Sequence, residues 1–220
     1  TDFDSFMEMA SAKLNLVTSP IAFKTAEMMK KEFGIPYLTA YVSYDPEEIM
    51  EVYRKLQKAL DLDFGPALEQ EKEKACEEIR KAKEIIGDYP IAVDYQAVLR
   101  PYSLALMMSR NGFHMGMVAS DSVSAFEKAS FEALKKEVPK ILIENPMSHN
   151  AVKFPHEGEN YLCIGFDCGY MTGSDRVADL MEDEGMFGFY GTRRLMEMLR
   201  EAYRSKADVR EMIVKAGLII

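Results

Sequence analysis

Residues 89–121 constrain the fold of this 220-residue chain more than any other stretch. The stretch opens with a short apolar run at 91–93, and Pro101 then suits the first position of a helix, because the amide hydrogen that proline lacks would have no partner there. Asn111-Gly112 tolerates the left-handed backbone that ends helices, and a second apolar run follows at 115–119. The stretch therefore predicts a βαβ unit with two parallel strands.

The same pattern occurs earlier in the chain. Residues 14–18 form an apolar run, Ser19-Pro20 is a helix start, and Gly34 is a helix stop. Residues 36–42 are rich in β-branched and aromatic side chains, and a capping box at 45–48 begins the next helix. These features predict a second βαβ unit in the first half of the chain.

A highly charged segment at 67–86 separates the two halves. It keeps a narrow apolar stripe at helical spacing, made by Leu68, Ala75, Ile79, Ala82 and Ile86. We interpret it as a long surface helix that bridges two lobes and ends at Gly87-Asp88. The predicted domains are therefore residues 1–88, a first lobe with the bridging helix, and residues 89–220, a second lobe with C-terminal helices.

The rest of the second half alternates helices and strands, which predicts an α/β fold with mostly parallel sheets flanked by helices. Helices are expected at 122–137, 192–205 and 209–216, strands at 140–144 and 161–166, and irregular structure at 145–160 and 167–190.

Composition excludes several classes of function. The net charge of −9 argues against nucleic acid or an anionic membrane as a partner, and no apolar run approaches the length of a membrane span. The N-terminus is not a signal peptide and lacks an initiator Met, which indicates a processed chain or an excised domain. The presence of only three cysteines argues against a structural disulfide framework. A reducing, cytoplasmic location is therefore expected.

Arg100 lies in the loop after the first strand of the organising unit. Ligands of α/β sheets meet such loops, where strand ends and helix N-termini converge. A cation in this position predicts an anionic ligand. The alternative is an internal ion pair with a carboxylate such as Asp94 or Asp121.

Cys163 and Cys168, with His149 and His156 upstream, are residue types that bind metals. Their spacing is not that of a zinc knuckle, and Cys163 falls in a predicted buried strand. A nucleophilic Cys168 with a histidine partner is a second alternative, and a purely structural role is the third. The sequence has no glycine-rich phosphate fingerprint.

Several segments together resemble the nitrogenase component 1 type oxidoreductase family, in particular its α-subunit type. They are LNLV at 14–17 followed by a helix and FGIPY at 33–37, Arg100-Pro101 followed by a helix and Gly112-Phe113, VPKI at 138–141, and GMFGFYG at 185–191. The family includes the nitrogenase molybdenum-iron protein, its cofactor-assembly scaffold, the dark-operative protochlorophyllide and chlorophyllide reductases, and a relative in nickel-tetrapyrrole biosynthesis.

The resemblance implies two Rossmann-like lobes, corresponding to the C-terminal two domains of such a subunit, around a cofactor or substrate cavity. It also implies electrons from an ATP-dependent iron–sulfur reductase and a homologous component 1 subunit in a homo- or hetero-oligomer. A cluster-assembly scaffold and a non-catalytic module that binds a metal cluster or tetrapyrrole remain alternatives.

Two departures from the family bear on cofactors. In the nitrogenase α-subunit a cysteine and a histidine hold the iron-molybdenum cofactor, and the matching positions here are Ser19 and Phe187. The cysteines of the family's electron-relay cluster lie in an N-terminal domain that is not expected within this chain. We therefore expect no cofactor in this chain alone, and an iron–sulfur cluster or a metal or tetrapyrrole ligand only in a full-length complex.

The resulting site prediction is a cleft between the lobes lined by Arg100, Ser19, Phe187 and Tyr190. Arg100 and the two helix starts favour an anion. Phe187 and Tyr190 would add an apolar wall where the family has a metal ligand. The predicted ligand is a large, partly apolar anion, and no metal-ligating or catalytic residue is assigned.

Overall fold

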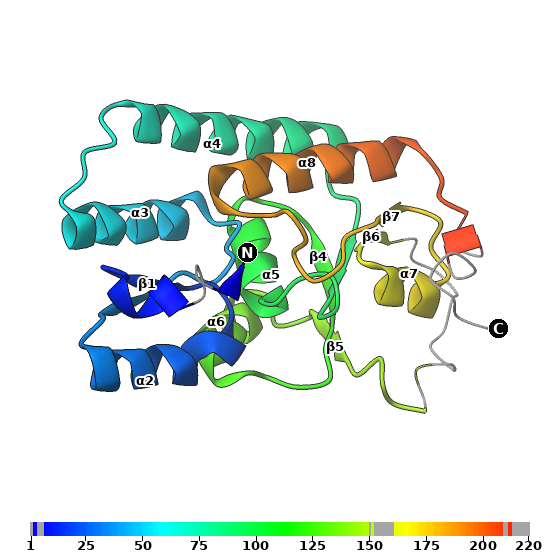
Figure 1. Ribbon diagram of the computed structural model, residues 1–220. Coiled ribbons are helices and arrows are strands. Elements are labelled where there is room, and N and C mark those ends of the chain that lie inside the picture. Colours follow the sequence, from blue (N-terminus) through cyan, green and yellow to red (C-terminus); the bar gives the residue numbers. More distant parts are fainter. Residues whose placement is uncertain (1, 4–6, 150, 152–160, 209–210, 213–220) are drawn as a thin grey trace.

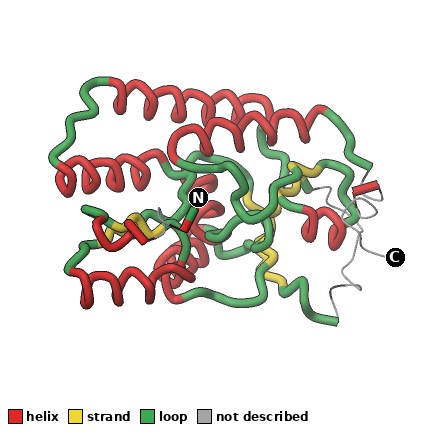
Figure 2. Tube along the Cα trace, viewed as in Figure 1, coloured by secondary structure: helices red, strands yellow, loops and turns green. Residues whose placement is uncertain are grey.

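The computed structural model describes residues 2–3, 7–149, 151, 161–208 and 211–212. Its strands fall into two separate groups (Figures 1 and 2), a two-stranded sheet and a five-stranded sheet. Every strand pairing in both sheets is parallel. Helices surround both sheets, so the predicted α/β class with parallel sheets is confirmed.

The larger sheet has the order β5-β4-β3-β6-β7. Its strands are β3 (Ile91–Asp94), β4 (Met115–Ala119), β5 (Leu142–Glu144), β6 (Leu162–Ile164) and β7 (Val177–Ala178). Strands β3 and β6 are buried along their whole length, because each is apolar on both faces. The chain runs outward from β3 through β4 to β5, and then returns to the other side of β3 for β6 and β7.

The two faces of this sheet are covered by different helices. One face shares its core with α4 (Ala67–Ile86), α5 (Pro101–Arg110), α6 (Lys128–Glu137) and α8 (Gly188–Arg204). The other face packs mainly on α7 (Phe166–Thr172), through Cys168 and Met171. The predicted βαβ unit is thus β3, α5 and β4, as the sequence indicates.

The smaller sheet pairs β1 (Asn15–Val17) with β2 (Tyr37–Thr39). A 3-10 turn, η2 (Pro20–Ala22), and α2 (Phe23–Phe33) connect the two strands. Gly34 ends α2 with a φ of 72°, a left-handed conformation that glycine adopts without steric cost. The Asp45 side chain then caps α3 (Pro46–Leu60) by accepting a hydrogen bond from the Glu47 amide.

Helix α4 is confirmed over its whole predicted length, and Figure 1 shows it lying alongside α8. Four members of its stripe, Ala75, Ile79, Ala82 and Ile86, are buried. Arg193 and Arg200 of α8 pair with Glu71 and Glu78 of α4. The predicted domain boundary near residue 88 falls in the turn after α4, while the stripe of α4 shares a core with the second lobe.

Several predicted elements differ from the structure. The segment 167–190, expected to be irregular, contains most of α7 and all of β7, and α8 starts at Gly188 rather than at residue 192. The N-cap residue of α7, Gly165, supplies no capping side chain and β7 has only two residues, so neither element carries a strong local signal. The two-stranded first sheet is smaller than expected, and most of the predicted helix at 209–216 lies outside the described residues. No helix in the described part of the chain is long and apolar enough to cross a membrane.

An additional 3-10 turn, η1 (Glu8–Ser11), precedes β1, and another, η3 (Ala125–Glu127), precedes α6.

Candidate functional site

Arg100 lies at the start of α5 and makes a two-point ion pair with Glu48 on α3. Its Nη1 atom lies 2.7 Å from Glu48 Oε2, and Nη2 lies 3.3 Å from Oε1. Burial alone would raise the pKa of Glu48, but the hydrogen bond and charge of Arg100 outweigh it and lower that pKa. The guanidinium fork is therefore already occupied by a carboxylate of the first lobe, and neither Asp94 nor Asp121 is its partner.

A second contact between the lobes forms beside this ion pair. The Tyr44 hydroxyl donates to Asp183 Oδ1 at 2.6 Å, and the Leu99 amide donates to Asp183 Oδ2 at 2.8 Å. The Thr192 hydroxyl donates to the carbonyl of Tyr44. Burial raises the pKa of Asp183 and that of Tyr44. This buried network ties the loop before α3 to the start of α8.

Asp183 belongs to a loop with unusual backbone geometry. Glu182 and Asp183 have φ angles of 50° and 55°, in the left-handed region. The amides of both residues donate to the loop after β3, to the carbonyls of Gln96 and Ala97. Left-handed non-glycine residues persist only where their surroundings hold them. The two amide bonds fix this loop within the second lobe, and the Tyr44–Asp183 hydrogen bond ties it to the first lobe. The loop comes shortly before Phe187 in the sequence.

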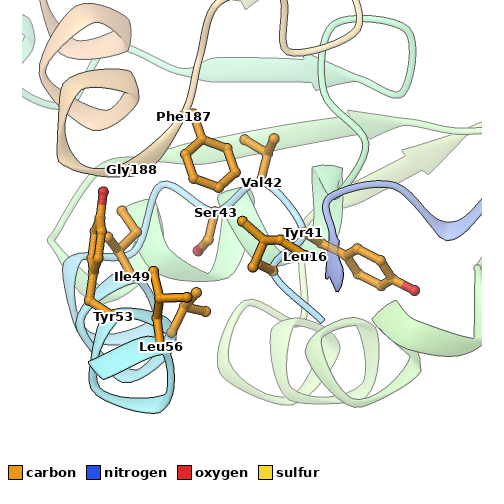
Figure 3. Close-up of a pocket in the computed structure, with 11 residues that line it drawn as sticks. Leu16, Tyr41, Val42, Ser43, Ile49, Tyr53, Leu56, Phe187 and Gly188 are labelled. Carbon is orange, nitrogen blue, oxygen red and sulfur yellow. The ribbon is translucent and has the colours of Figure 1, made fainter. Parts of the chain in front are cut away.

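Phe187 lines a pocket between the first lobe and the start of α8 (Figure 3). We call it the Phe187 pocket; its wall is made by Leu16, residues 40–43, Ile49, Val52, Tyr53, Leu56, Phe187 and Gly188. The space that these residues surround, about 420 Å³, includes volume open to solvent. Both lobes contribute, because Phe187 and Gly188 lie at the start of α8 while the other residues come from β1, the segment after β2, and α3.

The four predicted site residues do not converge on one cavity. Tyr190 lines a different, more polar pocket with Asp179, Glu184 and Arg194. Ser19 is half-buried at the start of η2, makes no capping hydrogen bond, and does not line the Phe187 pocket. Phe187 therefore lies in a pocket lined by both lobes, and Arg100 contacts the first lobe through its pair with Glu48.

Asp94 is the feature that sequence reasoning passed over. The direction of the chain through the large sheet reverses between β3 and β6, which is where α/β sheets bind ligands. Asp94 Oδ1 accepts from the Ala97 amide at 2.8 Å, and Oδ2 accepts from the Cys168 amide in the first turn of α7 at 3.0 Å. The chain's own carboxylate thus occupies the place where nucleotide-binding sheets hold a phosphate.

Gly165 allows this arrangement, since a Cβ there would lie 2.3 Å from Asp94 Oδ2. Burial raises the pKa of Asp94 to about 6, although the two amide hydrogen bonds act in the opposite direction. Asp94 is the last residue of β3, and Gly165 directly follows β6. These positions at strand ends are the sequence feature that could have indicated the contact between them.

The cysteines do not form a metal site with the described histidine. Cys163 and Cys168 are fully buried, and burial raises the pKa of the Cys168 thiol well above its ordinary value. A thiol held in its neutral form is a poor nucleophile. His156 lies outside the described residues. Among those that the structure describes, including His149, no three histidine, cysteine or acidic side chains are grouped to hold a metal.

Comparison with known proteins places this geometry in a family. The family model for nitrogenase component 1 type oxidoreductases matches residues 1–204. A solved structure entitled "Nitrogenase Cp1 at pH 6.5" has the same fold, with a TM-score of 0.65 and 15% sequence identity. The match covers 89% of this chain and 46% of that one, so this chain spans about half the length of that relative. No curated protein matches the chain.

The family match covers both sheets and the helices around them, from the first strand to the last residue of α8. The chain therefore belongs to the nitrogenase component 1 type oxidoreductase family.

Proposed function

We propose that this chain is the ligand-binding part of a component 1 type oxidoreductase, and that the Phe187 pocket is its cofactor or substrate site. The observation that carries the proposal is the position of Phe187. It lies in the glycine-rich segment that resembles the cofactor-binding segment of the family, and it faces a pocket built by both lobes. Ligand sites prefer such junctions between structural units.

The rest of the proposed machinery follows from family membership. Electrons would come from an ATP-dependent iron–sulfur reductase through a cluster, and a homologous component 1 subunit would complete the complex. The three cysteines of this chain do not supply a typical four-thiolate iron–sulfur site, so such a cluster would use ligands from elsewhere.

The residues present do not fit the iron-molybdenum cofactor of nitrogenase. Ser19 and Phe187 stand where that cofactor has a thiolate and an imidazole, and a phenyl ring donates no electron pair to a metal. Ser19 and Phe187 also do not line one pocket. No step of the proposed reaction is therefore assigned to that cofactor.

The test uses the full-length gene product, its homologous subunit and the ATP-dependent reductase. The visible absorbance of the reduced reductase cluster is followed after mixing. Oxidation that requires both ATP and the component 1 protein is the expected result. A reductase that stays reduced under all conditions would overturn the redox role.

The absence of metal-ligating side chains at Ser19 and Phe187 favours a second candidate function. This is a binding module or assembly scaffold that holds its ligand without reducing it. A scaffold needs the fold and the pocket but no electron transfer. The same experiment separates the two candidates, because a scaffold would bind a ligand and leave the reductase cluster reduced.

A further inference from the structure

We propose that the Phe187 pocket takes an uncharged, apolar ring system, held by burial and by one hydrogen bond to Tyr53. This inference deepens the proposed function by naming the class of ligand. It rests on that function only for the location of the site. Binding of such a ring does not require the reductase or any electron transfer.

The first argument is the charge of the wall. None of the residues that line the pocket carries a charge, and most are aliphatic or aromatic. Arg100 and Glu48 pair with each other at 2.7 Å, and neither of them lines the pocket. An anion or cation in the pocket would lose hydration without gaining an oppositely charged partner, which costs several kcal/mol or more. An uncharged ligand has no such cost.

The second argument is the incomplete burial of the wall. Leu16 and Phe187 are 41% and 43% exposed, and Val52 and Leu56 on α3 are only partly buried. All four side chains line the pocket, and Figure 3 shows Leu16, Leu56 and Phe187 around it. A ligand that covers them removes apolar surface from water at roughly 25 cal/mol per Å².

The third argument is the Tyr53 hydroxyl. The Tyr53 ring is fixed by stacking on Phe189, with centroids 5.7 Å apart, and by an edge contact with Phe64 at 5.9 Å. Its hydroxyl makes no hydrogen bond to the described residues and lies beside Gly188 (Figure 3). A Cβ at Gly188 would be 2.8 Å from that oxygen. The glycine thus leaves the hydroxyl open at the pocket wall, where it can donate to or accept from a ligand.

The test uses two fluorescent probes with the same rings. N-phenyl-1-naphthylamine is uncharged, and 1-anilinonaphthalene-8-sulfonate carries one sulfonate. We expect the neutral probe to bind with increased fluorescence, and the sulfonate to bind at least about tenfold more weakly, because it must desolvate its charge. Equal or tighter binding of the sulfonate at the same site would overturn the assignment of an uncharged ligand.

Two matched variants identify the site. Val52→Trp fills the pocket, while Val123→Trp makes the same change at a 39% exposed position between β4 and α6, outside the pocket. We expect Val52→Trp to weaken the neutral probe by at least about tenfold, and Val123→Trp to change it less than about twofold. Circular dichroism and thermal melts confirm that both variants fold.

Each remaining outcome is decisive. If the wild type does not bind the neutral probe, or if folded Val52→Trp binds it as the wild type does, the pocket assignment is wrong. Loss of reductase oxidation with intact probe binding would instead contradict the redox role alone. The two proposals therefore fail separately.

Discussion

The two lobes bury their sheets to very different degrees. The large sheet of the second lobe has five strands, and all four residues of β3 have no exposed surface. The sheet of the first lobe has two strands, and Leu16 in β1 is substantially exposed. The helix that crosses between those two strands also leaves large apolar side chains in solvent, namely Met28 and Phe33.

This difference shows which part of the molecule depends on contacts beyond itself. A two-stranded sheet is marginally stable on its own, whereas a five-stranded sheet with helices on both faces has a complete core. The first lobe is joined to the second by the Arg100–Glu48 pair, by Tyr44 and Asp183, and by α4. The second lobe thus has the more complete core, and the first lobe leaves more apolar surface exposed.

The largest expected effect is a difference in unfolding free energy between alanine substitutions at one glycine in each lobe. Gly165→Ala should destabilise the protein by at least about 4 kcal/mol, because the new methyl meets a buried carboxylate and φ is 99°. Gly34→Ala in the first lobe meets no atom within 4 Å and should cost only roughly 1–2 kcal/mol, for its left-handed backbone. Urea unfolding of both variants measures the difference, and equal costs would contradict the contrast between the lobes.

The second prediction concerns pH and Asp94. Its pKa is about 6 in the folded protein and 3.8 in the unfolded chain, so the folded state favours the neutral acid. Stability from this group is full below pH 3.8 and is lost as pH rises through 6, by about 3 kcal/mol. The difference in unfolding free energy between wild type and Asp94→Asn should shrink in that window. A difference independent of pH would show that the pKa of Asp94 is the same in the folded and unfolded states.

A smaller effect is expected for the ion pair between the lobes. A double-mutant cycle with Arg100→Gln and Glu48→Gln should give a coupling of about 1 kcal/mol, since Glu48 is 45% exposed and solvent screens the pair. The control is Arg110–Glu137, a similar two-point pair within the second lobe that is more exposed at Arg110. Its coupling should stay below about 0.5 kcal/mol. A larger coupling energy for Arg110–Glu137 than for Arg100–Glu48 would contradict the prediction that the pair between the lobes is the stronger one.

The smallest effect is expected on the outer surface of the first lobe. Ile21 is 90% exposed, so Ile21→Ala should change the unfolding free energy by less than about 0.5 kcal/mol. Ile79→Ala on α4, which is almost fully buried, should cost roughly 2–5 kcal/mol. Similar costs for the two isoleucines would mean that the first lobe is covered in solution, and light scattering would then detect the assembly.

Most of the fold could be predicted from local sequence signals. The stripe of α4 repeats at helical spacing, and Pro101 and Gly34 mark a helix start and a helix end, so these elements are correctly placed. Helix α7 and strand β7 were missed, because their short segments are held by contacts with distant residues. Asp94 caps α7 from a strand 74 positions earlier, and no local pattern contains that information.

The site was less predictable for a related reason. The pairing of Arg100 with Glu48 joins residues 52 positions apart, and the contact of Tyr44 with Asp183 joins residues 139 apart. Side-chain types indicated that Arg100 would meet an anionic ligand or a carboxylate such as Asp94 or Asp121, but not that its partner would be Glu48. Phe187 was found through its glycine-rich surroundings. The apolar wall opposite it comes from α3, whose outward face was not distinguishable from a core face by spacing alone.

The contact between α4 and α8 has a consequence for how the protein is made. Ile79 and Ala82 of α4 belong to the same core cluster as Leu195 and Leu199 of α8. During synthesis, α4 leaves the ribosome more than a hundred residues before α8 does. The apolar stripe of α4 therefore stays unpaired with α8 until the end of the family-matched region has emerged. A chain that stops before α8 would expose this stripe, and it should be a substrate for chaperones and proteases.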